Sequence, residues 1–183
     1  ISYRGGMYRI QRLRPDYVEG IGTDRLTELV WRLTPKGRGL VMQHFAYPKV
    51  NTVRKNAQLN HTLAIVDVLV TCKDYLGGFV IEPKLTGCRP DALVGVGRGK
   101  LLKPFFLEVD RGTQSINVVK KKCAQYESWA RTKERERKFG NVVPQVLYIT
   151  NRDDKVRESI KGGYVVWHVL RKENLHQWLK QYV

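Results

Sequence analysis

Three acidic residues, Asp91, Glu108 and Asp110, are spaced so that their carboxylates can meet. Glu108 and Asp110 lie two positions apart in an apolar stretch typical of a β-strand, and this spacing puts both side chains on one face. Asp91 follows Pro90 at the start of the preceding strand, and neighbouring strands of a hairpin lie about 4.8 Å apart. Carboxylates gathered in this way are stable around a cation, and their hard oxygen atoms suit Mg²⁺ or Mn²⁺. The sequence therefore predicts a metal site that activates water and stabilises charge on a phosphodiester.

The elements that would position these residues form an α/β domain at residues 53–183, preceded by a basic segment at residues 1–52. A hairpin joins the second and third strands, and helices between strands imply an α+β mixed sheet with helices on both faces. Hydrophobic periodicity and the breaks at glycine and proline predict helices at 53–73, 115–138 and 172–182, and strands at 79–82, 89–96, 103–110, 142–150 and 164–170.

The charge of the chain points to a polyanionic partner. The 183 residues include 33 Lys and Arg against 17 Asp and Glu, a formal net charge of +16. DNA favours such a surface through counterion release, so we expect double-stranded DNA as the partner. The sequence has no apolar run of about 18 residues, signal peptide or lipidation motif, which argues against a membrane protein. An odd number of cysteines, three, without a CxxC pair indicates reduced thiols in a cytoplasmic protein.

The basic segment at residues 1–52 has a short motif of its own. A strand at 28–34 runs into the turn 34–40, and this stretch resembles the second wing strand and following helix of a winged helix-turn-helix domain. The alternative is an irregular basic arm. Either version places six basic residues near phosphates, namely Arg4, Arg9, Arg12, Arg14, Lys36 and Arg38.

The order α-β-β-β-α-β at residues 53–150 resembles the core of the PD-(D/E)XK restriction-endonuclease-like superfamily. Pro90-Asp91 matches its first motif and Glu108-Val109 the next, but Asp110 stands where that family has a catalytic lysine. The resemblance implies that Lys122 or Lys120, from the following helix, replaces that lysine. Lys122 and Tyr126 are also spaced like the Gln-x-x-x-Tyr element of RecB-type nucleases, with Lys in place of Gln.

A closer resemblance is to the plasmid replication-relaxation proteins, which combine a winged-helix part with a nuclease-like domain. Its pieces are Leu59-Asn60-His61, Arg89-Pro90-Asp91-Ala92, the block Phe106 to Thr113, and Lys122 with Tyr126. By this resemblance the protein serves the replication of plasmid or mobile-element DNA and changes in DNA topology, and other replication proteins are expected among its partners.

Further residues have both a functional and a structural interpretation. Accessory site roles are assigned to His61, Glu82, Lys120 and Tyr126, against packing or solvated roles for each, and Arg89 and Arg111 are expected to contact DNA or to pair with the carboxylates. Three functions follow: a Mg²⁺- or Mn²⁺-dependent DNA endonuclease or nickase, a non-catalytic DNA-binding replication factor, and an RNA-binding protein. The oligomeric state is left open, and a dimer is compatible with the sequence.

Overall fold

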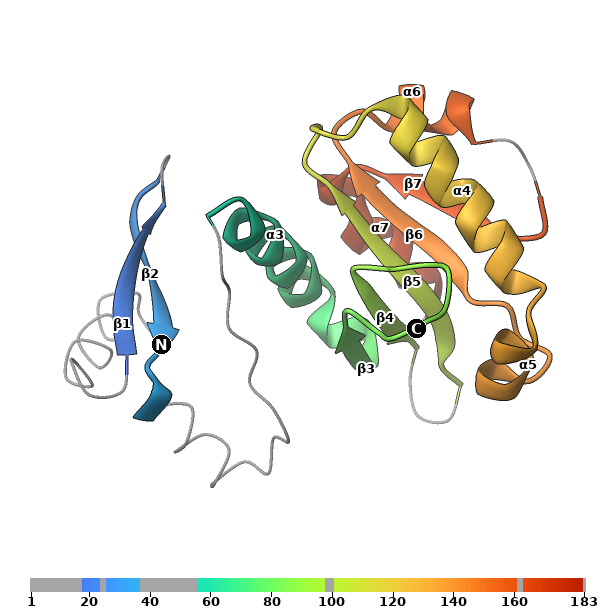
Figure 1. Cartoon of the computed structure of the whole chain (residues 1–183), viewed down its shortest axis with the longest axis horizontal. Helices are drawn as coiled ribbons and strands as arrows, with labels where there is room; N and C mark the ends of the chain where they lie inside the picture. The colour runs from blue at the N-terminus through green and yellow to red at the C-terminus, as the bar shows by residue number, and fades with distance from the viewer. Residues whose placement is uncertain (1–17, 24–25, 37–55, 98–100, 161–162, 183) are drawn as a thin grey trace. The chain divides into compact units, whose positions relative to one another are not determined.

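The protein is described by a computed structural model that covers residues 18–23, 26–36, 56–97, 101–160 and 163–182. The chain divides into two compact units, residues 1–60 and 61–183 (Figure 1). In the first unit, β1 (Val18–Thr23) and β2 (Leu26–Leu33) form an antiparallel hairpin, which confirms the strand predicted at 28–34. Lys36 is exposed, while the predicted phosphate contacts Arg4, Arg9, Arg12, Arg14 and Arg38 lie outside the described residues.

The second unit is built on one mixed sheet of five strands in the order β3-β4-β5-β6-β7. Strands β3, β4 and β5 are antiparallel, whereas β5, β6 and β7 are parallel, so the predicted mixed sheet is confirmed. The strands are β3 (Leu76–Ile81), β4 (Ala92–Val96), β5 (Lys103–Asp110), β6 (Gln145–Thr150) and β7 (Trp167–Leu170). The helices are α3 (Asn56–Cys72), α4 (Ile116–Ala130), α5 (Lys133–Phe139), α6 (Asp153–Ser159) and α7 (Leu175–Leu179).

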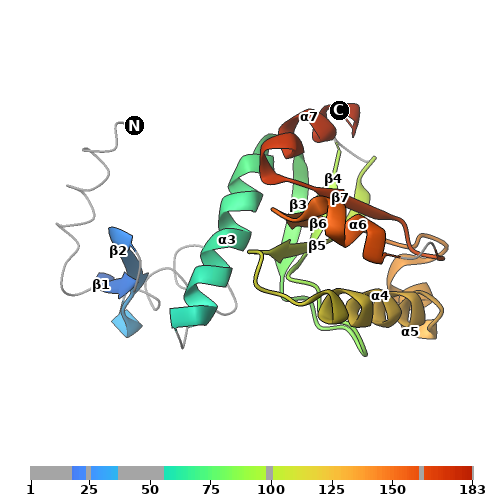
Figure 2. The same ribbon diagram turned by 90° about the horizontal axis from the view of Figure 1, so that it is seen from above.

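Helices cover both faces of this sheet (Figure 2). Phe105, Leu107 and Val109 pack with α3 and α7 in one core. The opposite face of β5 presents Phe106, Glu108 and Asp110 to the side of α4, and it is buried as well. The alternation predicted along this strand is therefore confirmed, but the acidic face is covered by a helix, which leaves Glu108 1% and Asp110 3% exposed.

The helix predicted at 115–138 is two helices. Ser115 caps α4, but the helix ends at Ala130. Thr132 caps a separate helix, α5, by accepting a hydrogen bond from the Arg135 N–H. Three smaller corrections follow. Helix α6 was not predicted, and the strand predicted at 164–170 begins at Trp167. In the closing helix predicted at 172–182, the α-helical part is Leu175–Leu179, flanked by 3₁₀ turns.

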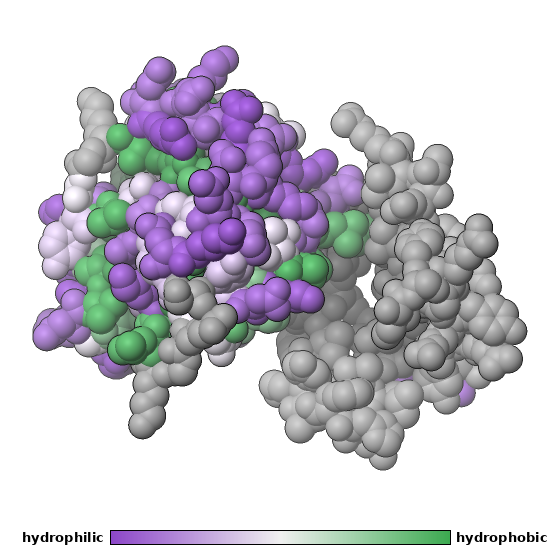
Figure 3. Space-filling view, turned by 180° about the vertical axis from the view of Figure 1, so that it is seen from behind, coloured by the Kyte–Doolittle hydropathy of each residue, from purple (hydrophilic) through white to green (hydrophobic). Residues whose placement is uncertain are grey.

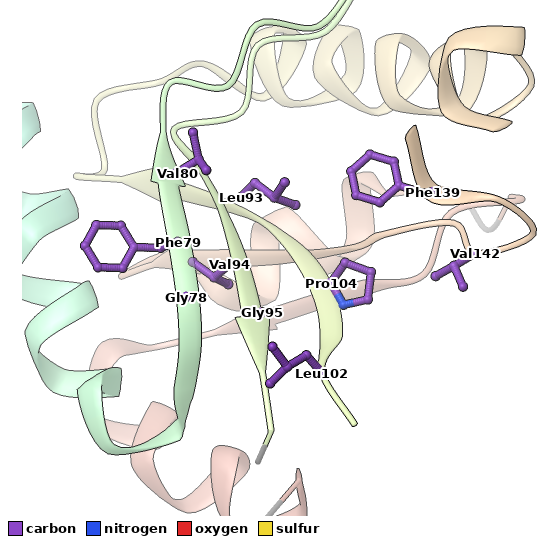
Figure 4. A pocket seen from close by; sticks show the side chains of 10 residues that line it. All are labelled: Gly78, Phe79, Val80, Leu93, Val94, Gly95, Leu102, Pro104, Phe139 and Val142. Atoms are coloured by element: carbon purple, nitrogen blue, oxygen red, sulfur yellow. The ribbon is translucent and has the colours of Figure 1, made fainter. Parts of the chain in front are cut away.

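The strand β3 forms one edge of the sheet and carries no charged residue. Phe79 and Val80 are 55% and 54% exposed. Beside them, Val80, Leu93 and Phe139 line an apolar hollow of about 510 Å³ over the uncovered part of the sheet (Figure 4). Hydrophilic side chains cover most of the described surface of this unit seen from behind, with smaller hydrophobic areas between them (Figure 3). Among the described residues, no helix is both long and apolar enough to cross a membrane.

Candidate functional site

Asp91 is fixed by the end of the β4–β5 ladder. It directly precedes β4, and its N–H donates to the Leu107 carbonyl at 3.0 Å. Its Oδ2 accepts the Val109 N–H at 2.8 Å, a donor that has no partner on β4 because the ladder stops at Ala92. Its Oδ1 lies 2.9 Å from Nε2 of His61 on α3, so the predicted accessory histidine contacts the predicted acid. This hydrogen bond raises the pKa of His61 above its ordinary value, although burial opposes it.

Glu108 is held by two side chains of α4. Lys122 donates to Oε2, and the Tyr126 hydroxyl donates to Oε1 at 2.5 Å. A spacing of four residues puts Lys122 and Tyr126 one helical turn apart, so both reach the same carboxylate. Burial raises the pKa of Glu108 to about 7, and the charge of Asp91 adds to this, while Lys122 and Tyr126 oppose it. Lys122 therefore occupies the place next to Glu108 that the PD-(D/E)XK resemblance assigned to a replacement lysine.

A pocket of about 450 Å³ opens on this pair. Glu108 lies at its inner wall, and the exposed side chains of Arg89 and Gln125 lie at its mouth. Its lining residues are Leu85, Gly87, Arg89, Glu108, Lys122, Gln125 and Tyr126. The pocket thus combines one buried carboxylate with two cations, a composition that suits an anionic group such as a phosphate.

Asp110 belongs to a neighbouring network. Its Oδ2 accepts Nη2 of Arg152 at 2.7 Å and the Thr150 hydroxyl at 3.1 Å, and its Oδ1 accepts the Gly112 N–H at 2.9 Å. Burial works against ionisation of this carboxyl, but the hydrogen bonds from Arg152, Gln114 and Thr150 outweigh it and lower the pKa of Asp110. Asp110 stands in the lysine position of the motif and acts here as an anchor for the loop that follows β5.

The structure does not bring the remaining predicted residues to the Glu108 pocket. Glu82 is exposed and contributes its N–H to the Asp91 carbonyl, with a left-handed φ of 48°. Lys120 lines a different cavity, with Cys123 and Glu127, and Arg111 is exposed on the loop after β5. Sequence reasoning missed Arg152 and Gln125. Arg152 had no signal, because its partner Asp110 lies 42 residues away in the sequence, whereas Gln125 follows the predicted Lys122 on the same helix.

Two carboxylates, those of Asp91 and Glu108, are the candidate ligands for a divalent cation, in place of the three predicted from the sequence. Within the described part of the chain, no group of three His, Cys, Asp or Glu side chains is placed to hold a metal ion. Mg²⁺ commonly binds through one or two carboxylates together with substrate phosphates, and Asp91 and Glu108 supply two. A carboxylate has about four lone-pair positions, and the hydrogen bonds described above take two on each of these residues. The pair therefore retains free acceptor positions for an ion.

The three tryptophans of the second unit are packed within the fold. Trp129 is buried, and Trp167 and Trp178 pack against other rings, so these tryptophans are not free to stack on bases. Cys72, Cys88 and Cys123 are free thiols, and burial raises the pKa of Cys88 to about 12.

These features define a mixed α/β protein with a lysine–glutamate pair at the base of a basic pocket. A family model described as replication-relaxation matches residues 8–146, and the chain belongs to the replication-relaxation family. The predicted membership of the replication-relaxation family is thereby confirmed, and the family indicates a role in plasmid replication and relaxation. The matched residues include Asp91, Glu108, Lys122 and Tyr126. Neither the curated proteins nor the solved structures gave a match.

Proposed function

We propose that the chain is a DNA-binding protein of plasmid or mobile-element replication whose Glu108 pocket cleaves a phosphodiester bond in one strand. The observation that carries the proposal is the contact between Lys122 and Glu108 beside Asp91. Through this contact Lys122 provides the Asp91 and Glu108 pair with a lysine, since Asp110, two residues after Glu108, is not one. The net charge of +16 supports binding to DNA.

Residues that line the pocket and two neighbours, Asp91 and His61, have separate roles in this proposal. Asp91 and Glu108 would hold one Mg²⁺ or Mn²⁺, which supplies an activated water and neutralises phosphate charge. Arg89 and Lys122 are placed to pair with the oxygen atoms of a phosphate that enters the pocket, and charge aimed at a developing oxyanion is a large catalytic contribution. Tyr126 fixes the Glu108 carboxylate, and His61 fixes Asp91, so both acids are oriented before substrate binds.

Supercoiled plasmid incubated with Mg²⁺ or Mn²⁺ tests this proposal. Wild-type protein is expected to produce nicked circles, and Asp91→Asn and Glu108→Gln are expected to lower the rate by at least about 100-fold. Lys122→Ala should lower it by about 10- to 100-fold, because it removes charge stabilisation but not an acid. Lys120→Ala is the matched control, since Lys120 is an exposed lysine of the same helix that lines another cavity, and its rate should stay at the wild-type value.

A second candidate is a non-catalytic DNA-binding replication factor on a nuclease-like scaffold. It is favoured by the depth of Glu108, which is 1% exposed, and by the ion pair that Asp110 makes with Arg152 in the lysine position. It predicts that wild type, Asp91→Asn and Glu108→Gln bind plasmid equally and that none of them nicks it. Absence of both binding and nicking in the wild type would contradict both candidates.

A further inference from the structure

We infer that a groove between α4 and the loop at residues 85–89 guides one DNA strand away from the Glu108 pocket. The inference rests on the proposed function and deepens it by naming a track for the substrate. Two hollows, of about 450 and 280 Å³, share Gly87 and Gln125 in their linings, so they adjoin, and together they are called the groove here. The second hollow is lined by Thr86, Gly87, Lys121, Ala124, Gln125, Ser128, Trp129 and Thr132.

The charge of this groove suits a phosphate backbone. Arg89, Lys121 and Lys122 line it, and Glu108, which Lys122 already holds, is the single acid among the described residues of the two linings. The described lining of the second hollow has no acidic residue and adds the neutral hydrogen-bonding groups of Gln125 and Ser128. Proteins usually position a nucleic acid through contacts of lysine and neutral polar side chains with its phosphate backbone.

The size of the groove suits one strand. Hollows of a few hundred Å³ are the size of small-molecule sites, so each accommodates a nucleotide and not a duplex. The lining residues of α4 run from Lys121 to Trp129, over which the helix rises by about 12 Å. This length matches about three to four nucleotides of one strand at the ~3.4 Å spacing of a duplex.

The wall opposite α4 is held in place by α5. Oε2 of Glu134 accepts the Thr86 N–H at 2.9 Å and Nε1 of Trp129 at 3.2 Å, so one carboxylate joins the loop to α4. Lys138 donates to the Lys84 carbonyl at 3.3 Å. The break between α4 and α5 therefore has a structural role, because it turns Glu134 and Lys138 toward the loop that forms the wall.

The salt dependence of DNA affinity tests the groove. Each phosphate contact contributes about 0.9 to the slope of log affinity against log salt on duplex DNA and about 0.7 on a single strand. Lys121→Ala in the full chain is expected to reduce the size of this slope by the amount for about one phosphate contact, on duplex and on single-stranded DNA alike. Lys121→Arg should keep the wild-type slope. Lys180→Ala is the control, since Lys180 is an exposed lysine beside α7, whose core residues lie on the opposite face of the sheet.

The outcomes separate the inference from the function on which it rests. Wild-type protein that binds neither form of DNA would overturn both. Wild-type binding with equal slopes for Lys121→Ala and Lys180→Ala would overturn the groove and leave the proposed function standing. An effect of Lys121→Ala confined to duplex DNA would overturn the assignment to a single strand, and an effect seen with RNA but not with DNA would overturn the assignment to DNA.

Discussion

The Glu108→Gln protein is expected to be more stable than wild type at pH 8 and of similar stability at pH 4.5. Burial raises the pKa of Glu108 from 4.5 to about 7, so the folded state binds this proton more tightly than the unfolded state does. The free energy of unfolding must then fall as the pH rises from about 4.5 to about 7, and it levels off above that range. At about 1.4 kcal/mol for each pKa unit, this one group accounts for a loss on the order of 3 kcal/mol. Glutamine cannot ionise and escapes that loss.

Urea unfolding at the two pH values measures this effect. We expect a gain of about 1–3 kcal/mol at pH 8, reduced below the full amount because Lys122 loses its partner. Glu158→Gln, at an exposed residue of α6, is the control and should leave the pH dependence unchanged. A Glu108→Gln protein that is less stable at both pH values would contradict this prediction.

Mg²⁺ should stabilise wild type at pH 8 more than Glu108→Gln, which tests the metal site without an activity assay.

Arg152→Ala is expected to destabilise the protein by about 3 kcal/mol, because it leaves the buried carboxylate of Asp110 without its cation. The Asp110 side chain is 0% exposed and that of Arg152 is 29% exposed, so little water can replace the lost partner. Because the pKa of Asp110 is lowered in the folded state, the stabilisation by this network is present above its ordinary value of 3.8 and is lost as the pH falls through the lowered value.

Chemical unfolding of two further variants completes that test. Arg152→Ala with Asp110→Asn should recover a large part of the loss, since the second change removes the unpaired charge. Arg131→Ala serves as the control, because Arg131 is 70% exposed and 3.8 Å from Glu127, and its cost should stay below about 1 kcal/mol. Equal effects for Arg152→Ala and Arg131→Ala would show that the Asp110 network contributes little. Mg²⁺ that restores the stability of Arg152→Ala would place Asp110 among the metal ligands, as predicted from the sequence.

The part of the site that the sequence could predict depends on short-range periodicity. The spacing of two along β5 put Glu108 and Asp110 on one face, and the spacing of four along α4 put Lys122 and Tyr126 together. The hairpin brought Asp91 to β5 because its strands are adjacent in the sequence. Each of these relations is set by the geometry of a single strand, helix or hairpin.

The part that could not be predicted depends on contacts across the sheet. Asp110 meets Arg152 because β5 and β6 are parallel and in register, with Asp110 opposite Thr150. No local pattern encodes that register. The break at Arg131 and Thr132 was missed for a related reason. The charged run Lys133–Lys138 continues a helical composition, and besides the local cap by Thr132, α5 is held by the hydrogen bond from Thr86, 48 residues before Glu134. Tertiary contacts outweighed local propensity at this point.

Salt is expected to have two opposite effects on this protein, and the second depends on the uncharged edge strand β3. In the proposed DNA complex, salt competes with lysine and arginine for phosphates, so it is expected to release the nucleic acid. It also shortens the screening length from about 10 Å at 0.1 M to about 3 Å at 1 M, which removes the mutual repulsion of chains that each carry a charge of +16. The β3 edge, with the exposed Phe79 and Val80, can then approach a second copy without long-range electrostatic repulsion. Two such edges can pair symmetrically. The high-salt buffers that would dissociate the proposed DNA complex are therefore the conditions under which self-association is expected to be strongest, and the molecular mass should be measured at both low and high salt.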